Sequence, residues 1–213
     1  LKAIGANAIL FQIRPNNDAF YPSHLNPWSR WLTGQEGRGL NGFDPLAFMI
    51  QEAHRRGLAF HAWLNPYRVA GATPLWKKTY LNTLAPGNFA RKHPEYVLSI
   101  RRKDGKNQLI LDPGNPAVIR FLCNTVHEIV TKYDVDGIHL DDYFYPYDGT
   151  GSADRATYLR FNRNRMSLED WRRENVNTLV GSLSNVIRSC NARYHKNIQF
   201  GISPFGIWAN VKT

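Results

Sequence analysis

Two adjacent carboxylates follow a strand-like segment, and they are the residues of this sequence best placed for nucleophilic or acid–base chemistry. The segment DGIHLDDYFYPYD (136–148) combines an aliphatic run with His139, Asp141, Asp142 and four aromatic residues. Alternate residues of a strand share a face, so His139 and Asp141 point away from the aliphatic residues between them. A carboxylate beside an imidazole can stay ionised and attack, or stabilise, an oxocarbenium-like centre. We therefore predict Asp141 as nucleophile or stabiliser, with His139 orienting it.

Asp142 points to the opposite face of the same segment and is expected near the rim, as a second candidate catalytic carboxylate. The alternative for either aspartate is an ordinary salt-bridged or helix-capping role. The sequence contains no G-x-S-x-G, no H-E-x-x-H and no phosphate-binding glycine loop, so other hydrolytic and nucleotide chemistries lack support. No metal-ligand spacing is found either, and we expect neither a metal nor a cofactor.

Polar and aromatic residues gather at the ends of two other predicted strands. Strand parity places His61, Trp63 and Asn65 on one face of the second strand, and Gln12 and Arg14 on one face of the first. Such groups suit sugar hydroxyls, although core polar residues satisfied by their neighbours would look the same. Aromatic rings, which stack on pyranose faces, crowd the predicted loops. The residues predicted to bind substrate are Arg14, Gln12, Asn16, His61, Trp63, Asn65, Tyr67, Tyr143, Tyr145 and Ser203.

Short aliphatic runs alternate with helical patterns along the chain, which is typical of βα units and a parallel sheet. Strands are predicted at 7–15, 58–66, 136–144 and 198–206, the first too apolar to be half exposed. Helices are predicted to start at the caps Asp44, Asn115 and Ser167. Long loops follow three of the strands, and one of them contains a β-hairpin about Asp104 and Gly105.

The predicted fold class is α/β, a (β/α)8 TIM barrel of which this chain contains about half. A barrel places its active site at the C-terminal ends of the strands, where the polar residues gather here. The Rossmann alternative lacks a G-x-G-x-x-G turn after any strand. Four strands do not close a barrel, so we expect residues 1–213 to form a partial barrel domain, cut from a longer chain at both ends.

Composition and charge narrow the class of partner. The chain has 27 Lys and Arg against 17 Asp and Glu, a net charge of +10, which favours a polyanionic partner or a solvated basic surface. The basic residues are dispersed and no recognition motif is present, so nucleic acid is not expected. No apolar run is long enough to span a membrane. Cys123 and Cys190 lie on helical apolar stripes and are expected as small buried thiols rather than a disulfide.

Four motifs in order, FQIRPNNDAFYPS, HAWLNPYR, LDPGNP and DGIHLDDYFYP, resemble the glycosyl-hydrolase-like family 10 domain of bacterial cell-surface proteins. The resemblance covers essentially the whole chain. It implies a TIM barrel whose second to fifth strands are those seen here, and cleavage of glycans, with peptidoglycan glycan strands as the substrate. It also implies a place in the bacterial envelope, in the periplasm or as an outer-membrane lipoprotein, and raises the option of a lipid anchor in sequence preceding Leu1.

A more distant resemblance is to the alpha-amylase superfamily, in which a segment similar to DGIHLDD carries the nucleophile. On that pattern Asp141 falls at the nucleophile, Asn65 near the end of the third strand, and His139 where the superfamily has an arginine. An imidazole can be neutral where an arginine is always charged. The superfamily's acid glutamate has no counterpart, because the next strand offers Ser203. The acid would come from Asp142, from Asp148, or from a strand outside this chain.

The sequence thus supports a glycoside hydrolase with a carboxylate-based mechanism. The alternative is a non-catalytic glycan-binding barrel module that has lost its acid. Nucleic-acid binding is a third and weaker hypothesis.

Overall fold

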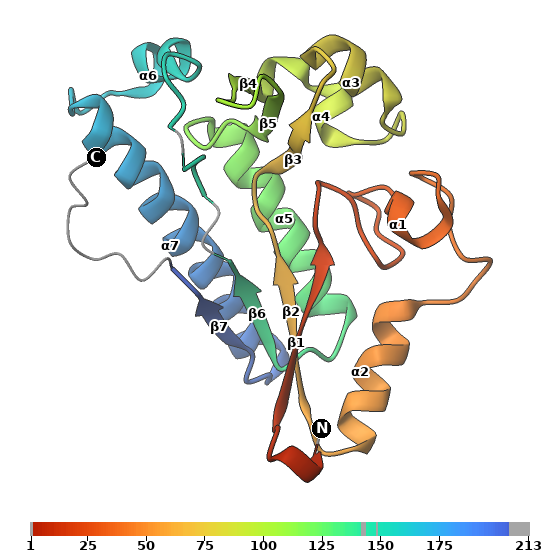
Figure 1. The fold of residues 1–213 in the computed structure, drawn as a ribbon. Helices are drawn as coiled ribbons and strands as arrows, with labels where there is room; N and C mark the ends of the chain where they lie inside the picture. The colour runs from red at the N-terminus through yellow and green to blue at the C-terminus, as the bar shows by residue number, and fades with distance from the viewer. Residues whose placement is uncertain (1, 142–143, 148, 205–213) are drawn as a thin grey trace.

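A four-stranded parallel sheet in the order β1-β2-β6-β7 forms the centre of the molecule (Figure 1). The structure is a computed structural model that describes residues 2–141, 144–147 and 149–204. Each strand pairs in parallel with the next, so all four C-terminal ends lie at one edge of the sheet. The strands are β1 (Ala8–Arg14), β2 (Ala59–Leu64), β6 (Gly137–Leu140) and β7 (Gln199–Ile202). Their spatial order follows their chain order, as in successive units of a barrel.

Three long helices connect these strands and cover the outer side of the sheet (Figure 1). They are α2 (Pro45–Arg55), α5 (Pro116–Lys132) and α7 (Leu168–Tyr194). The three predicted caps are confirmed, because the side chains of Asp44, Asn115 and Ser167 each accept a backbone N–H of the first turn. Ile138 and Leu140 are fully buried in the core that also contains residues of α5 and α7. The α/β class and the partial barrel are therefore confirmed.

A second, antiparallel sheet stands beyond the C-terminal edge of the first, in the order β3-β5-β4. Its strands are β3 (Arg68–Thr73), β4 (Val97–Arg101) and β5 (Asn107–Leu111). The predicted hairpin about Asp104 and Gly105 is confirmed as β4 and β5, whereas β3 was not expected. The described residues also form short helices: η1 (Lys2–Ile4), α1 (Arg30–Thr33), α3 (Lys77–Thr83), α4 (Phe89–Lys92), η2 (Pro94–Tyr96) and α6 (Arg155–Phe161).

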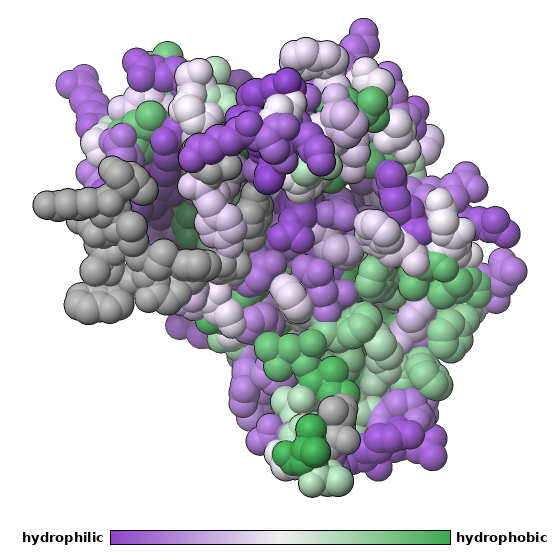
Figure 2. Space-filling model, in the orientation of Figure 1, coloured by the Kyte–Doolittle hydropathy of each residue, from purple (hydrophilic) through white to green (hydrophobic). Residues whose placement is uncertain are grey.

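One expectation about β1 is wrong, since this strand is partly exposed. Leu10 and Phe11 are 48% and 36% exposed, because β1 is an edge strand of the sheet. Figure 2 shows hydrophobic side chains gathered in the lower part of the molecule, over β1 and α2, and mostly hydrophilic ones above. The third strand is also shorter than predicted, ending at Leu140.

The structure also bears on the cysteines and on membrane insertion. Cys123 is half-buried and Cys190 is buried, and both are free thiols whose pKa is raised by burial, as expected of packing residues. Across the described ranges, no helix has both the length and the hydropathy that crossing a membrane would need.

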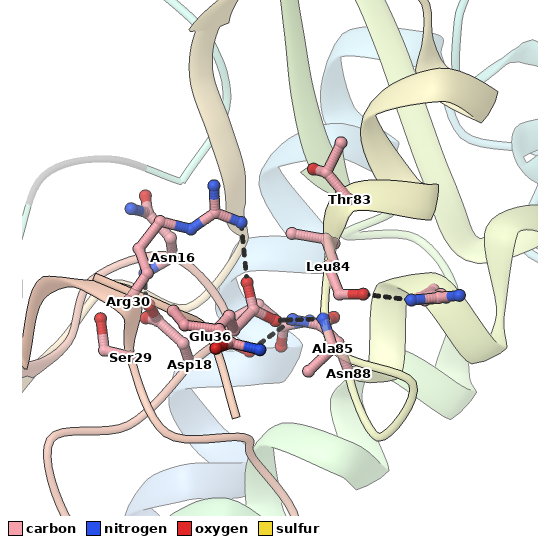
Figure 3. Close-up of polar contacts among 12 residues, drawn as sticks. Asn16, Asp18, Ser29, Arg30, Glu36, Thr83, Leu84, Ala85 and Asn88 are labelled. Atoms are coloured by element: carbon pink, nitrogen blue, oxygen red, sulfur yellow. Dashed lines mark hydrogen bonds and ion pairs between the residues drawn. The ribbon is translucent and has the colours of Figure 1, made fainter. Parts of the chain in front are cut away.

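A buried polar cluster ties the loop after β1 to the segment after α3, and we call Asp18, Arg30, Glu36 and Asn88 the Glu36 cluster (Figure 3). Glu36 is only 5% exposed in its side chain and forms an ion pair of 3.0 Å with Arg30. Its other oxygen accepts the Asn88 amide at 2.9 Å and the Ala85 N–H at 3.1 Å. Burial raises the pKa of the neighbouring Asp18. These contacts fix a long loop that has little regular structure of its own.

Candidate active site

The inner face of the parallel sheet carries polar side chains in register from strand to strand. Trp63 of β2 pairs with His139 of β6, and their rings meet edge to face with centroids 6.5 Å apart. His61 pairs with Gly137 in the same way, one layer lower. His61, Trp63 and His139 are half-buried, whereas their neighbours on the other face are buried in the core. Strand parity therefore placed these three side chains correctly.

Two glycines make room for the two histidine rings. A Cβ on Gly137 would lie 2.5 Å from Nδ1 of His61, and one on Gly201 would lie 3.0 Å from Nδ1 of His139. Each histidine thus leans over the glycine to which it is paired on the next strand. A side chain at Gly137 would displace the His61 ring, so glycine at this position determines how the imidazole lies.

Asp141 follows β6 directly and its carboxylate is held by two side chains from the end of β2. The Asn65 amide donates to both carboxylate oxygens, at 3.0 and 3.2 Å, and the Trp63 indole N–H donates at 3.3 Å. The side-chain oxygen Oδ1 of Asn65 accepts the Arg68 backbone N–H at 2.9 Å, and this contact fixes the orientation of the side-chain amide. Asp141 itself is half-buried. It is a fixed carboxylate with access to the mouth of the strands.

His139 lies beside Asp141 but makes its hydrogen bond elsewhere. Its Nε2 and the Ser203 hydroxyl share a hydrogen bond of 3.0 Å. Burial, reinforced by His61, lowers the pKa of His139, against an opposing effect of Asp141. The imidazole is therefore neutral at pH 7. Asn65 and Trp63 orient the Asp141 carboxylate, and the hypothesis that His139 also orients it stays a prediction.

Arg14 was predicted to contact sugar, and the structure corrects this. The register of β1 shifts between Gln12, which pairs with Trp63, and Arg14, which pairs with Leu64. This irregularity turns Arg14 toward the helix layer, where its guanidinium lies 5.5 Å from the centre of the Phe121 ring. The side chain is fully buried, and burial lowers its pKa to about 10. Arg14 therefore cannot touch substrate.

Arg14 instead supports the loop that holds Asp141. Its Nη1 donates to the carbonyls of Asn65 at 2.7 Å and Pro66 at 3.2 Å, and its Nε donates to Asn26 at 3.1 Å. Its Nη2 donates to Asn17. The guanidinium thus fixes the main chain of the residue whose side chain binds Asp141.

The remaining predicted residues divide into separate locations. Gln12 and Asn16 are half-buried near the mouth. Tyr67 is fully buried, so its predicted contact with substrate is wrong, and Asn65 is also fully covered, acting on Asp141 rather than on sugar. Tyr145 accepts a hydrogen bond of 3.1 Å from Asn175 of α7, away from Asp141. The candidates Asp142, Tyr143 and Asp148 lie outside the described residues.

Comparison with known proteins identifies the family. The family model described as glycosyl hydrolase-like 10 matches residues 1–213. This chain belongs to the glycosyl hydrolase-like 10 family. The resemblance read from the four sequence motifs is thereby confirmed, whereas the more distant likeness to the alpha-amylase superfamily stays a prediction.

Two curated relatives align with nearly the whole of this glycosyl hydrolase-like 10 chain. Glycosyl hydrolase YngK of Bacillus subtilis is 44% identical over 99% of the chain and 39% of its own length. Glycosyl hydrolase DigH of Escherichia coli is 38% identical over 99% of the chain and 46% of its own length. The chain therefore spans less than half the length of these relatives.

A solved structure supports the fold described here for this chain. A hypothetical protein from Ruminiclostridium thermocellum superposes with a TM-score of 0.52 at 15% identity, covering 96% of this chain and 86% of that one. At that identity the likeness concerns the fold alone.

Proposed function

We propose that this chain carries the nucleophile side of the active site of a glycoside hydrolase that cleaves peptidoglycan glycan strands. The observation that supports this most is the Asp141 carboxylate, fixed by Asn65 and Trp63 where the parallel strands end. Barrel enzymes place their catalytic groups at this edge. Family membership supports glycan hydrolysis, and the net charge of +10 suits strands whose lactyl carboxylates are bare after removal of stem peptides.

In this proposal Asp141 attacks, or stabilises, the oxocarbenium-like centre that forms as the glycosidic bond breaks. Asn65 and Trp63 hold the carboxylate at the ends of the strands, where it can face the positive charge that develops in the transition state. The neutral His139 and Ser203 pair lies beside it and offers a hydrogen bond to a sugar hydroxyl. The acid that protonates the leaving oxygen is Asp142, Asp148 or a residue from another strand. A separation of about 5 Å from Asp141 would give retention, and roughly 6.5–9.5 Å inversion.

The test is the Asp141→Asn substitution in the full-length protein, with peptide-free glycan strands as substrate. Loss of a charged nucleophile should reduce turnover by at least about a thousandfold, or roughly 4 kcal/mol of barrier. Asp134→Asn is the matched control, because Asp134 is exposed at the opposite end of β6 and should leave turnover unchanged. Release of reducing ends is measured for both. Full turnover by Asp141→Asn would end the proposal.

The same experiment separates the enzyme from a non-catalytic glycan-binding module. A binding module would hold the strands tightly and release no reducing ends in the wild type. The proposal further requires the protein to be in the bacterial cell envelope, where peptidoglycan lies, through an export signal or lipid anchor preceding Leu1. Fractionation of cells producing the full-length protein tests this, and recovery with the cytoplasm alone would contradict it.

A further inference from the structure

The antiparallel sheet and its helices carry most of the chain's uncompensated positive charge. Residues 68–111, which form β3, β4, β5 and the short helices between them, contain nine Lys and Arg against two Asp and Glu. This is a net charge of +7 out of +10 for the whole chain. Figure 1 places this unit at the end of the molecule away from the N-terminus, where Figure 2 shows mostly hydrophilic side chains. Such a concentration of charge favours an anionic partner.

An exposed apolar loop lies within this positive charge. Leu75 and Trp76 are 37% and 71% exposed, and the preceding Pro74 is exposed as well. The Arg101 guanidinium lies 5.8 Å from the centre of the Trp76 ring. Arg101 and Lys106, at the two ends of the hairpin turn, are also exposed. We call these five residues the Trp76 tip, a surface that combines an apolar centre with adjacent cations.

Buried polar contacts hold the Trp76 tip in place. The buried Asn107 side chain donates to the Leu75 carbonyl at 3.0 Å, and Thr73 Oγ1 accepts the Leu75 N–H at 3.1 Å. On the other side of Trp76, Lys77 Nζ donates to two backbone carbonyls of η2 and β4, at 3.2 and 3.0 Å. The main chain is therefore fixed on both sides of Trp76, and the ring is exposed because the fold places it there.

Helix stability does not explain a tryptophan at this position. Trp76 is the N-cap of α3, where Ser, Thr, Asp or Asn is preferred because its side chain can accept a backbone N–H of the first turn. The indole ring has a donor and no acceptor, so it cannot cap the helix in this way. A residue that does not stabilise its helix and leaves a large ring in water is best explained by a partner that covers the ring.

We propose that the Trp76 tip docks on an anionic phospholipid surface, with the Trp76 ring at the boundary between head groups and acyl chains. Tryptophan favours this boundary, because one end of its ring system is apolar and the other is polar. Arg101 and Lys106 then lie near the lipid phosphates, where each cation contributes about fivefold in affinity. This is attachment to a bilayer surface and not a span.

A bilayer suits this surface better than a hydrated anionic polymer such as a glycan strand. Pro74 and Leu75 add aliphatic surface beside the Trp76 ring, and acyl chains would remove this surface from water whereas a hydrated strand would not. The docking surface is separate from Asp141, so the inference does not depend on the proposed function.

The test is sedimentation of the full-length protein, produced without lipid modification, with vesicles of stated composition. One set contains phosphatidylglycerol and phosphatidylcholine, and the other contains phosphatidylcholine alone. The wild type should bind the anionic vesicles at least about tenfold more tightly, because several cations face the anionic lipid. Raising the salt concentration to about 0.5 M should remove most of this difference, because the charges are exposed and screened.

Two substitutions test the two parts of the surface, each with a matched control. Trp76→Ala should weaken binding to anionic vesicles about tenfold, because a large apolar side chain is lost. Its control is Trp31→Ala, because Trp31 is 69% exposed on α1. Arg101→Gln should weaken binding about fivefold. Its control is Arg193→Gln, because Arg193 of α7 also lies over an exposed ring, 5.6 Å from the centre of Tyr194. Neither control should change binding.

Melting temperatures of all four variants should match that of the wild type, since the changed side chains are exposed. Absence of wild-type binding, equal binding to both vesicle types, or equal losses in a variant and its control would overturn the proposal. It would also be overturned if both tip substitutions weakened binding to peptide-free glycan strands and not to vesicles, because the surface would then serve the glycan. Vesicle binding requires no turnover, so failure of the proposed hydrolase would leave this result standing.

Discussion

Two carboxylates of this molecule each accept a hydrogen bond from an asparagine amide, but they differ in burial and in their other partners. Asn88 donates to Glu36 at 2.9 Å, and Asn65 donates to Asp141 at 3.0 Å. Glu36 is almost fully buried and paired with Arg30, whereas Asp141 is half-buried and accepts hydrogen bonds from the neutral side chains of Asn65 and Trp63. We infer that the buried, ion-paired Glu36 stabilises a loop, whereas the half-buried Asp141 at the ends of the strands is placed for chemistry.

The region around Asp141 and the Glu36 cluster are connected through Arg14. Its guanidinium donates to the Asn65 carbonyl on one side and to Asn17 on the other, and Asn17 donates to Asn88 at 2.9 Å. An unbroken series of hydrogen bonds therefore runs from Asp141 to Glu36. The loop that the Glu36 cluster fixes and the loop that positions Asp141 share one buried cation.

Replacing that cation should produce the largest loss of stability. Arg14→Met would leave several buried acceptors without a donor, so we expect unfolding to become easier by about 3–5 kcal/mol. Urea denaturation followed by circular dichroism measures this. Arg14→Lys keeps the charge but not the forked geometry of the guanidinium, so its unfolding free energy should lie between those of the wild type and Arg14→Met. A stable Arg14→Met protein would show that the two regions are independent.

Asn65→Asp should act on Asp141 and produce the next largest effect. Two carboxylates facing each other do not both ionise readily, so one proton is retained to higher pH. Because the proposed mechanism needs an ionised Asp141, the acid limb of the pH–rate profile should move upward, with about a hundredfold loss of kcat/KM at neutral pH, roughly 2.7 kcal/mol.

The matched control for that substitution is Asn88→Asp, which places the same chemical change beside Glu36. It should lower stability and leave the acid limb of the full-length enzyme in place. If both variants shift the limb equally, the distinction between the two carboxylates is wrong.

Glu36→Gln tests the structural carboxylate more gently. The amide can accept from Asn88 and Ala85 or face Arg30, but it cannot do both as the carboxylate does. We expect a loss of about 2 kcal/mol in unfolding free energy, the scale of a hydrogen bond to a charged group. The kcat/KM of folded protein, assayed well below its melting temperature, should change less than twofold. A large kinetic effect at unchanged stability would contradict the proposed division.

The sequence predicted much of this arrangement and missed specific parts for physical reasons. The alternation of residue types along β6 was enough to predict that Ile138 and Leu140 are buried and that His139 lies on the other face. The irregularity before Arg14 was not predictable, because one extra residue reverses the face of everything after it and FQIRP carries no local signal. The burial of Tyr67 and of Gln108 depends on how β3 and β5 pack over the C-terminal ends of the parallel strands. This is a contact between segments about 40 residues apart.

Asp18 gives the prediction with the smallest expected effect on stability. Its carboxyl is buried and lies in the Glu36 cluster. Burial raises the pKa of Asp18, partly offset by hydrogen bonds from Ser29 and the Asn16 N–H. A raised folded-state pKa means that the folded protein favours the protonated acid, so ionisation costs stability as pH rises above the unfolded value of about 3.9. Asp18→Asn removes this cost and keeps an acceptor for Asn16. Relative to the wild type, the variant should therefore gain stability between acidic and neutral pH, within about 1 kcal/mol. Urea midpoints at several pH values measure the difference, and a constant offset would show that folding does not change the pKa of Asp18.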